Sequence, residues 1–152
     1  MMAADEGAAV LETNNDGPKI PDKKKTKFDV IIIGAGPSGY TAGIYCSRAG
    51  YDTLILSGIL PGGQLVNTTE VENYPGFENG IMGPDLMIDM RKQSQRMGTT
   101  IIDDIAVDVD FRRAPYKVLT GSEEYESKAV IIATGANPKK MGITGEEEFS
   151  GK

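Results

Sequence analysis

The stretch KFDVIIIGAGPSGYTAGIYCSRAG, residues 27–50, decides the fold. Its β-branched run at residues 30–33 is typical of a strand that is covered on both faces. Residues 34–39 then match G-x-G-x-x-G, whose glycines allow a tight turn, a close approach of backbone to a pyrophosphate, and close packing of helix on strand. A helix over residues 41–49 and a second parallel strand over residues 53–56 would complete a βαβ unit. This context favours dinucleotide binding over a purely structural turn.

The composition narrows the possible function classes. The chain has 152 residues, enough for one domain with a real core, and a formal net charge of −6. Its Lys and Arg residues form no stripe interleaved with aromatics, which argues against a nucleic-acid partner. We see neither an apolar run of membrane-spanning length nor a secretory signal, so we expect no membrane partner and a cytoplasmic location.

The sequence contains no histidine and one cysteine, Cys46. Histidine-based acid/base chemistry, serine triads, zinc sites and an intramolecular disulfide are therefore excluded within this chain. Cys46 follows Gly39 and Gly43 at helical spacings that place it on the side of the helix that faces the sheet. We interpret it as a small buried core residue rather than a reactive thiol.

Two polar stretches flank the βαβ unit. Residues 1–26 have almost nothing to bury, and we expect a disordered N-terminal extension there. After the second strand, a dinucleotide fold often carries an acidic residue that binds a ribose hydroxyl, but this chain has Ser57 at that place. A serine cannot make paired carboxylate contacts, so it does not reveal the nucleotide preference. Residues 66–83 then form a long polar loop, of a kind that is usually functional or disordered.

The second half of the chain predicts a helix and further strands. The helix covers residues 84–97, beginning at Pro84 and stopped by Gly98. A third parallel strand over residues 99–102 should follow, and then an antiparallel three-stranded meander over residues 105–111, 116–120 and 124–127. The meander leads to residues 129–135, predicted as a second buried apolar strand that ends in a small-residue turn. The expected fold class is therefore α/β with a parallel sheet and a β-meander.

This order of elements resembles the FAD domain of the low-molecular-weight thioredoxin reductases. The likeness rests on GAGPSG at 34–39, PGGQL at 61–65, TEVENYPGF at 69–77 and IIATGANPKKMGITGEEEF at 131–149. It implies a Rossmann-like FAD-binding domain over residues 27–140, incomplete at its C-terminus. Residues 141–152 would begin the crossover to an NADPH domain that the chain lacks.

The resemblance also implies which residues bind the cofactor. The pyrophosphate of FAD would lie at Gly34, Gly36, Pro37, Ser38 and Gly39. Its adenosine ribose would lie near Ser57 and Gly58, and its adenine against backbone at Ala106 and Val107. The flavin would meet Gly63, Gln64, Leu65 and Asn73, although Asn73 could instead cap the turn before Pro75. The cofactor would be closed over by Ala133, Thr134 and Gly135.

In this family, electrons pass from NADPH to FAD, then to a Cys-x-x-Cys pair, and then to thioredoxin or a related dithiol protein. The sequence contains neither that pair nor a second glycine-rich motif. We therefore expect the N-terminal part of such a reductase, with no catalytic residue of its own, no activity alone and weak or absent FAD retention; the resemblance also implies a homodimer. The alternatives are a cysteine-free relative, such as a ferredoxin-NADP reductase, and a non-catalytic FAD-binding module.

Overall fold

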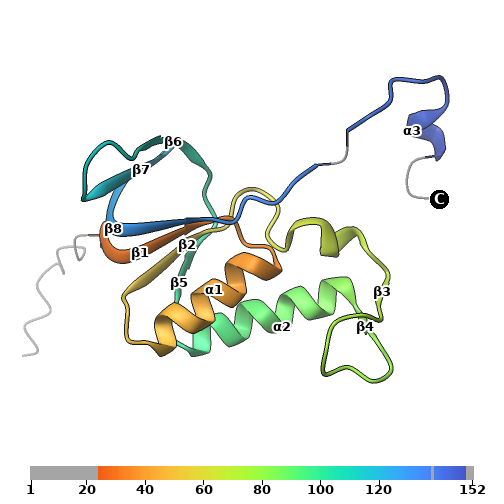
Figure 1. Cartoon of the computed structure of the whole chain (residues 1–152), viewed down its shortest axis with the longest axis horizontal. Helices are drawn as coiled ribbons and strands as arrows, with labels where there is room; N and C mark the ends of the chain where they lie inside the picture. The colour runs from red at the N-terminus through yellow and green to blue at the C-terminus, as the bar shows by residue number, and fades with distance from the viewer. Residues whose placement is uncertain (1–23, 138, 150–152) are drawn as a thin grey trace, which may run out of the picture.

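The structure is a computed structural model that describes residues 24–137 and 139–149. Strand β1 (Lys27–Ile33), which precedes the glycine turn, lies at the centre of a six-stranded sheet. The strand order is β5-β2-β1-β8-β7-β6 (Figure 1). The four parallel strands are β1, β2 (Thr53–Leu56), β5 (Thr100–Ile102) and β8 (Glu124–Ile132). The two antiparallel strands are β7 (Tyr116–Thr120) and β6 (Ala106–Asp110). This mixed sheet confirms the predicted α/β class, including the third parallel strand.

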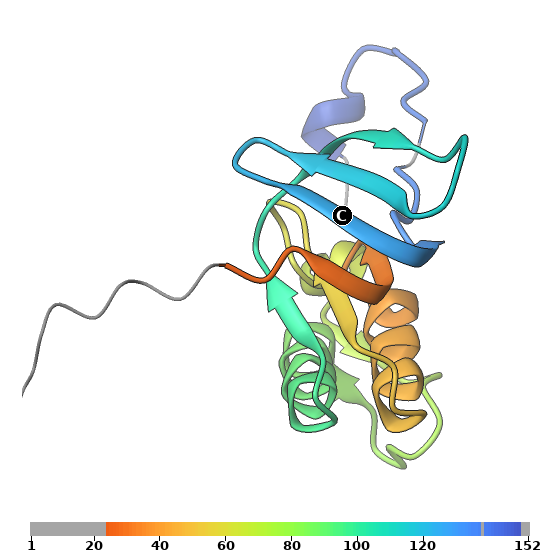
Figure 2. The same ribbon diagram turned by 90° about the vertical axis from the view of Figure 1, so that its left-hand side faces the viewer.

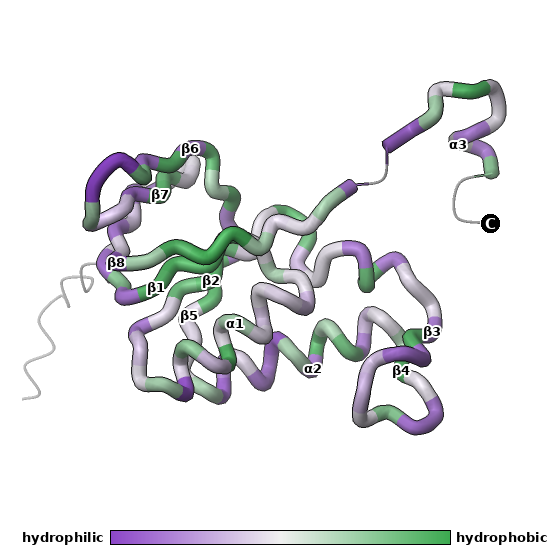
Figure 3. The backbone as a smooth tube through the Cα atoms, viewed as in Figure 1, coloured by the Kyte–Doolittle hydropathy of each residue, from purple (hydrophilic) through white to green (hydrophobic). Residues whose placement is uncertain are grey.

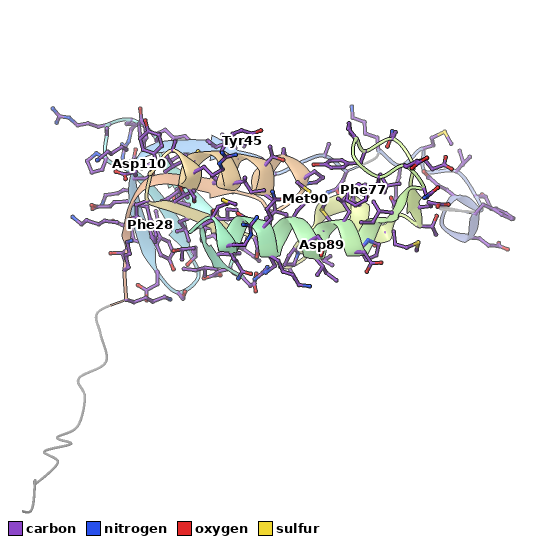
Figure 4. The ribbon with its side chains drawn as sticks, turned by 90° about the horizontal axis from the view of Figure 1, so that it is seen from below. Phe28, Tyr45, Phe77, Asp89, Met90 and Asp110 are labelled. Atoms are coloured by element: carbon purple, nitrogen blue, oxygen red, sulfur yellow. The ribbon has the colours of Figure 1, made fainter. Side chains whose placement is uncertain are left out.

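Two helices cover one face of the sheet, and the antiparallel strands curl over the other (Figure 2). Helix α1 (Pro37–Arg48) and helix α2 (Gly83–Arg96) lie side by side on the first face. Met90 on α2 is buried in the core between the helices and the sheet, whereas its neighbour Asp89 is exposed on the outer side (Figure 4). On the opposite face, Phe28 packs with Tyr125 at a ring-centroid distance of 6.3 Å.

Besides shifts of one to three residues at other element ends, the structure differs from the predicted elements at helix α1 and in the long loop. Helix α1 begins at Pro37, four residues before the predicted start, because a proline is well suited to the first helical position. The long loop over residues 66–83 is not structureless. It begins within a short 3₁₀ helix, η1 (Gly63–Asn67). It also contains strands β3 (Glu70–Val71) and β4 (Ile81–Met82), which pair as a two-stranded antiparallel sheet. The described segment after β8 leaves the sheet and ends in the short helix α3 (Glu146–Phe149) (Figure 1).

The prediction for the strand before Gly135 is wrong in two respects. The last meander strand and the apolar strand are one continuous element, β8, which pairs with β7 through residue Ser127 and with β1 along most of its length. Its second half is not buried, since Ile132 is 66% exposed even though this run is strongly hydrophobic (Figure 3). The reason is that β7 ends its pairing there, so β8 has one neighbour beyond Ser127. A run of apolar residues cannot show whether a strand has one neighbour or two.

The prediction for Cys46 concerns burial. Cys46 is half-buried and packs against the core under α1, rather than being fully buried, and burial raises the pKa of its thiol.

No helix in the described ranges is long and apolar enough to cross a bilayer. The expected disordered extension over residues 1–26 lies outside the described residues, apart from its last three.

Candidate functional site

A cavity of about 290 Å³ opens where β1, β2 and β8 end at their carboxyl edges. Ligand sites of open α/β sheets usually lie at this edge. Three segments form the walls: the glycine turn, the loop after β2 and the segment after β8. The lining residues are Gly34, Ala35, Gly36, Pro37, Ser38, Ser57, Leu60, Gly63, Gln64, Leu65, Ala133, Thr134 and Gly135. Eleven of these residues are among the sixteen predicted ones, so the fold brings most of the predicted site together.

The three glycines of the turn have three different surroundings. Gly34 has a φ of +109°, which favours glycine, and its N–H donates to the carbonyl of Leu56 at 2.8 Å. At Gly39, a Cβ would overlap the carbonyl oxygen of Gly34, so this residue lets α1 pack onto the turn. At Gly36, a Cβ would meet no atom within 4 Å. The middle glycine therefore borders open space, where a ligand could approach the backbone.

The N-terminus of α1 is also open to an anion. Gly36 caps this helix without a side-chain hydrogen bond, and no acidic residue stands in the first turn. Pro37 and Ser38 line the cavity, so the positive end of the helix dipole lies at its wall. Free N–H groups and this dipole make a helix start suitable for a phosphate.

The loop after β2 is held against the glycine turn. The N–H of Gly62 donates to the carbonyl of Ala35 at 2.8 Å, and a Cβ on Gly63 would lie 3.6 Å from the Cα of Gly36. Gln64 reaches in the other direction, since its Nε2 donates to the Oδ1 of Asn137 at 3.2 Å. The loop thereby bridges the two other walls of the cavity.

The end of β2 carries a polar network. Ser57 is 5% exposed, and its Oγ lies 2.6 Å from the Oδ1 of Asp103. Both carboxylate oxygens of Asp103 accept from Arg91 on α2, at 2.8 and 2.9 Å. The hydrogen bonds from Arg91, and after them the one from Ser57, hold the pKa of Asp103 below its ordinary value. A carboxylate thus stands directly behind the serine that replaces the expected acidic residue.

Five predicted residues do not line the cavity. Gly39 packs α1 on the turn, as described above, and Gly58 has a φ of +75° while its N–H donates to the carbonyl of Asp104. Asn73 is exposed in a separate hollow formed by its own loop, residues 72–78. The two remaining residues lie on β6, where Ala106 is half-buried and Val107 is exposed.

Sequence reasoning missed Ala35, Leu60, Asp103 and Asn137 as parts of this region. Signals existed for three of them: Ala35 and Asn137 lie inside the stretches 34–39 and 131–149 that carry the resemblance. Asp103 directly follows a predicted parallel strand, and the carboxyl ends of such strands meet at one edge.

The chemistry that these walls allow is binding rather than proton transfer. None of the thirteen lining residues has an ionisable side chain. Within the described ranges, no three or more His, Cys, Asp or Glu side chains are placed to hold a metal ion. The raised pKa of Cys46 favours its neutral thiol, which is the unreactive form.

Comparison with known proteins identifies the family. A family model described as pyridine nucleotide-disulphide oxidoreductase matches residues 28–152. The thioredoxin reductase of Rickettsia bellii is 50% identical over 128 residues, which are 84% of this chain and 41% of the relative. The solved structure of the Giardia duodenalis thioredoxin reductase matches with a TM-score of 0.74 and 36% identity, over 82% of this chain and 41% of that one. The Lactococcus lactis thioredoxin reductase matches with a TM-score of 0.73 and 43% identity, over 80% of this chain and 40% of that one.

The chain thus spans about two fifths of the length of these relatives. It is homologous to thioredoxin reductases, and the residues that the family model matches, 28–152, include both long helices and the cavity. This chain belongs to the pyridine nucleotide-disulphide oxidoreductase family.

Proposed function

We propose that this chain is the FAD-binding portion of a thioredoxin reductase-like flavoprotein, and that the cavity at the carboxyl edge of the sheet holds the dinucleotide. The observation that carries the proposal is the glycine turn. Gly36 borders open space at the N-terminus of α1, which carries no side-chain cap hydrogen bond. Both features suit a pyrophosphate, which backbone N–H groups at close range and the helix dipole can bind.

The rest of the cavity fits a long ligand. A second hollow of about 310 Å³ shares Gly63, Gln64 and Thr134 with the first and extends it to Asn137. The two hollows adjoin, because they share these lining residues, and we call them together the trough, which runs from Ser57 at the end of β2 to the segment after β8. In our proposal the adenosine ribose lies at Ser57, the pyrophosphate at Gly36 and Ser38, and the flavin end toward Gln64.

Bound FAD would supply the hydride and electron transfer, and the protein's part would be to bind and orient it. Glycine backbone allows a flat ring or a phosphate to come close, and Gln64 carries both a donor and an acceptor. No described residue at the trough is assigned a catalytic role. The single cysteine provides no second thiol for a dithiol step within this chain.

For the whole protein we propose NADPH as the electron donor and thioredoxin or a related dithiol protein as the acceptor. The support is that the matched relatives are thioredoxin reductases. The homodimer and the cytoplasmic location remain predictions, and so does the division of residues 27–140 and 141–152 between an FAD domain and a crossover.

The test introduces a negative charge that should stabilise helix α1 but repel the pyrophosphate of FAD. Ser38→Asp places a carboxylate in the exposed first turn of α1, where it should stabilise the helix by about 0.3–1 kcal/mol. The same carboxylate should lower FAD affinity at least about tenfold, since like charges 4 Å apart cost roughly 4 kcal/mol at a dielectric of about 20. Thr41→Asp is the matched control, because it adds this charge to an exposed position of the same helix outside the cavity.

The measurement is a titration of the purified 152-residue chain with FAD, followed by flavin fluorescence and by amide NMR shifts, up to millimolar ligand. We expect wild type and Thr41→Asp to bind alike, with amide shifts in residues 34–39, and Ser38→Asp to bind much more weakly without loss of melting temperature. Absence of any shift in these residues with wild type at millimolar FAD would refute the proposal.

A further inference from the structure

We propose that Asp103 is a positioning residue for the nucleotide ribose. It holds the proton of the Ser57 hydroxyl, so that Ser57 Oγ presents its lone pairs to a ribose hydroxyl in the trough. The inference rests on the proposed function, because it concerns the adenosine end of the same dinucleotide. It adds a residue that does not line the cavity and acts only through Ser57.

The placement of Asp103 follows from the sheet register. Strands β2 and β5 are parallel neighbours, with Leu56 opposite Ile102. The residues that come next, Ser57 and Asp103, therefore lie together at the carboxyl edge, and the N–H of Ser57 donates to the carbonyl of Ile102 at 3.0 Å. The 2.6 Å distance between Ser57 Oγ and Asp103 Oδ1 is typical of a strong bond to a charged oxygen.

The direction of this hydrogen bond is determined by Arg91. Its guanidinium donates to both oxygens of Asp103, at 2.8 and 2.9 Å, which keeps the carboxyl ionised. An ionised carboxylate can only accept, so the shared proton belongs to Ser57. The other acceptor near this hydroxyl, the carbonyl of Gly58, is more distant at 3.3 Å. With its proton engaged by Asp103, the Ser57 oxygen can only accept from a ligand.

An acceptor at this point selects the class of nucleotide. A free ribose hydroxyl can donate to Ser57 Oγ, whereas a ribose phosphate offers only acceptors and adds negative charge close to Asp103. Ser57 and Asp103 together thus perform the role of the acidic residue that many dinucleotide folds carry at the end of the second strand, here β2. Here the carboxylate comes from the neighbouring strand and acts through a serine. The predicted ligand class is a nucleotide whose ribose hydroxyls are unmodified.

The experiment compares ADP with 2′,3′-dideoxy-ADP, using amide NMR titrations of the 152-residue chain. The readout is the ratio of the two affinities, because a merely structural change would weaken both ligands alike. We expect Asp103→Ala to lower this ratio about fivefold, which corresponds to ~1 kcal/mol for one hydrogen bond. Asp103→Asn keeps an acceptor oxygen and should retain most of the ratio. Asp104→Asn is the matched control, since Asp104 is a neighbouring acid that accepts from Ser122 at 2.8 Å instead.

Ser57→Ala tests whether Asp103 acts through the serine, and it should lower the ratio as much as Asp103→Ala does. The double variant should lower it no further. An unchanged affinity ratio in Asp103→Ala would overturn the inference. If Asp103→Ala does not fold, an unchanged ratio in Ser57→Ala would overturn it instead. In either case, ADP binding by wild type leaves the proposed function standing. If neither ADP nor FAD shifts the amides of residues 34–39 in wild type, both the inference and the proposed function are overturned.

Discussion

Replacing each of two glycines of the turn by alanine should separate folding from binding. Gly39 and Gly36 are three residues apart, but their surroundings are opposite. A Cβ at Gly39 would overlap the Gly34 carbonyl oxygen and lie 2.9 Å from its carbon, which is rigid backbone. A Cβ at Gly36 would meet nothing within 4 Å, and the φ of −81° there is ordinary for alanine. Gly39→Ala should therefore damage the fold, whereas Gly36→Ala should damage only the site.

The magnitudes follow from these contacts. Overpacking typically costs about 1–3 kcal/mol, and the better helix propensity of alanine returns up to about 1 kcal/mol. Because the overlap at Gly39 is with rigid backbone, the upper part of that cost range applies, and Gly39→Ala should lower the free energy of unfolding by about 1–2 kcal/mol, or the melting temperature by roughly 3–8 °C. In Gly36→Ala, the loss of a good N-cap is offset by the reduced freedom of the unfolded chain, so the change should stay within about 0.5 kcal/mol. Its methyl group fills space at the proposed pyrophosphate position, and FAD affinity should fall at least about tenfold, ~1.4 kcal/mol.

Thermal unfolding by circular dichroism and FAD titration of the same samples measure the two effects. Gly121→Ala is the matched control, because a Cβ there also meets nothing within 4 Å and the residue lies in the turn between β7 and β8. It should change neither property. The reasoning is refuted if Gly36→Ala is destabilised as much as Gly39→Ala, or if it binds FAD as tightly as wild type.

Three further predictions concern other parts of the chain. Because Ile132 is 66% exposed on an open strand, we expect the chain to self-associate through this edge at high concentration in sedimentation velocity. Ile132→Lys should reduce that association while stability changes by less than about 0.5 kcal/mol, and unaltered association would contradict this. Because burial raises the pKa of the Cys46 thiol, this residue should react slowly with a disulfide reagent at pH 8 and much faster in denaturant. Equal reaction rates in the folded and the denatured chain would argue against that burial. The lowered pKa of Asp103 implies a stabilisation that is present above the ordinary value of 3.8 and lost as the pH falls through the folded-state value. The stability difference between wild type and Asp103→Asn should accordingly vanish in acid, and a constant difference down to pH 2 would exclude this linkage.

The local elements could be predicted because their signals are local. The β-branched run, the glycine turn and the apolar strand at residues 53–56 each lie within a few residues, and the structure has β1, α1 and β2 there. Register and neighbours could not be predicted in the same way. The continuous β8 and its exposed second half depend on where β7 stops pairing, which is a property of another strand. Apolar composition alone describes both a buried strand and an edge strand.

The same difference between local signals and long-range neighbours explains which site residues could be predicted from the sequence. The prediction for Ser57 considered what a serine can do alone, and that reasoning was sound for the isolated residue. The structure adds Asp103 and Arg91, which come from β5 and α2 and reach Ser57 only in the folded chain. No spacing in the sequence links residues 57, 91 and 103, although the strand order β5-β2-β1 places the first and last at one edge. A site residue that acts through another side chain becomes visible only when the sheet order is known.

The open half of β8 bears directly on the strength of the proposed site. Ala133, Thr134 and Gly135 form a wall of the trough and continue the strand half that has only β1 beside it. The N–H of Ala133 donates to the carbonyl of Ile33 at 2.8 Å, which is the last backbone hydrogen bond between this wall and the end of β1 among the described residues. A strand end paired on one side opens locally at lower free energy than one paired on both. A ligand that needs this wall closed must supply that free energy, so its affinity is reduced by the fraction of chains in which the wall is open. An open wall therefore weakens FAD retention in proportion to its population, even though the glycine turn is fully formed.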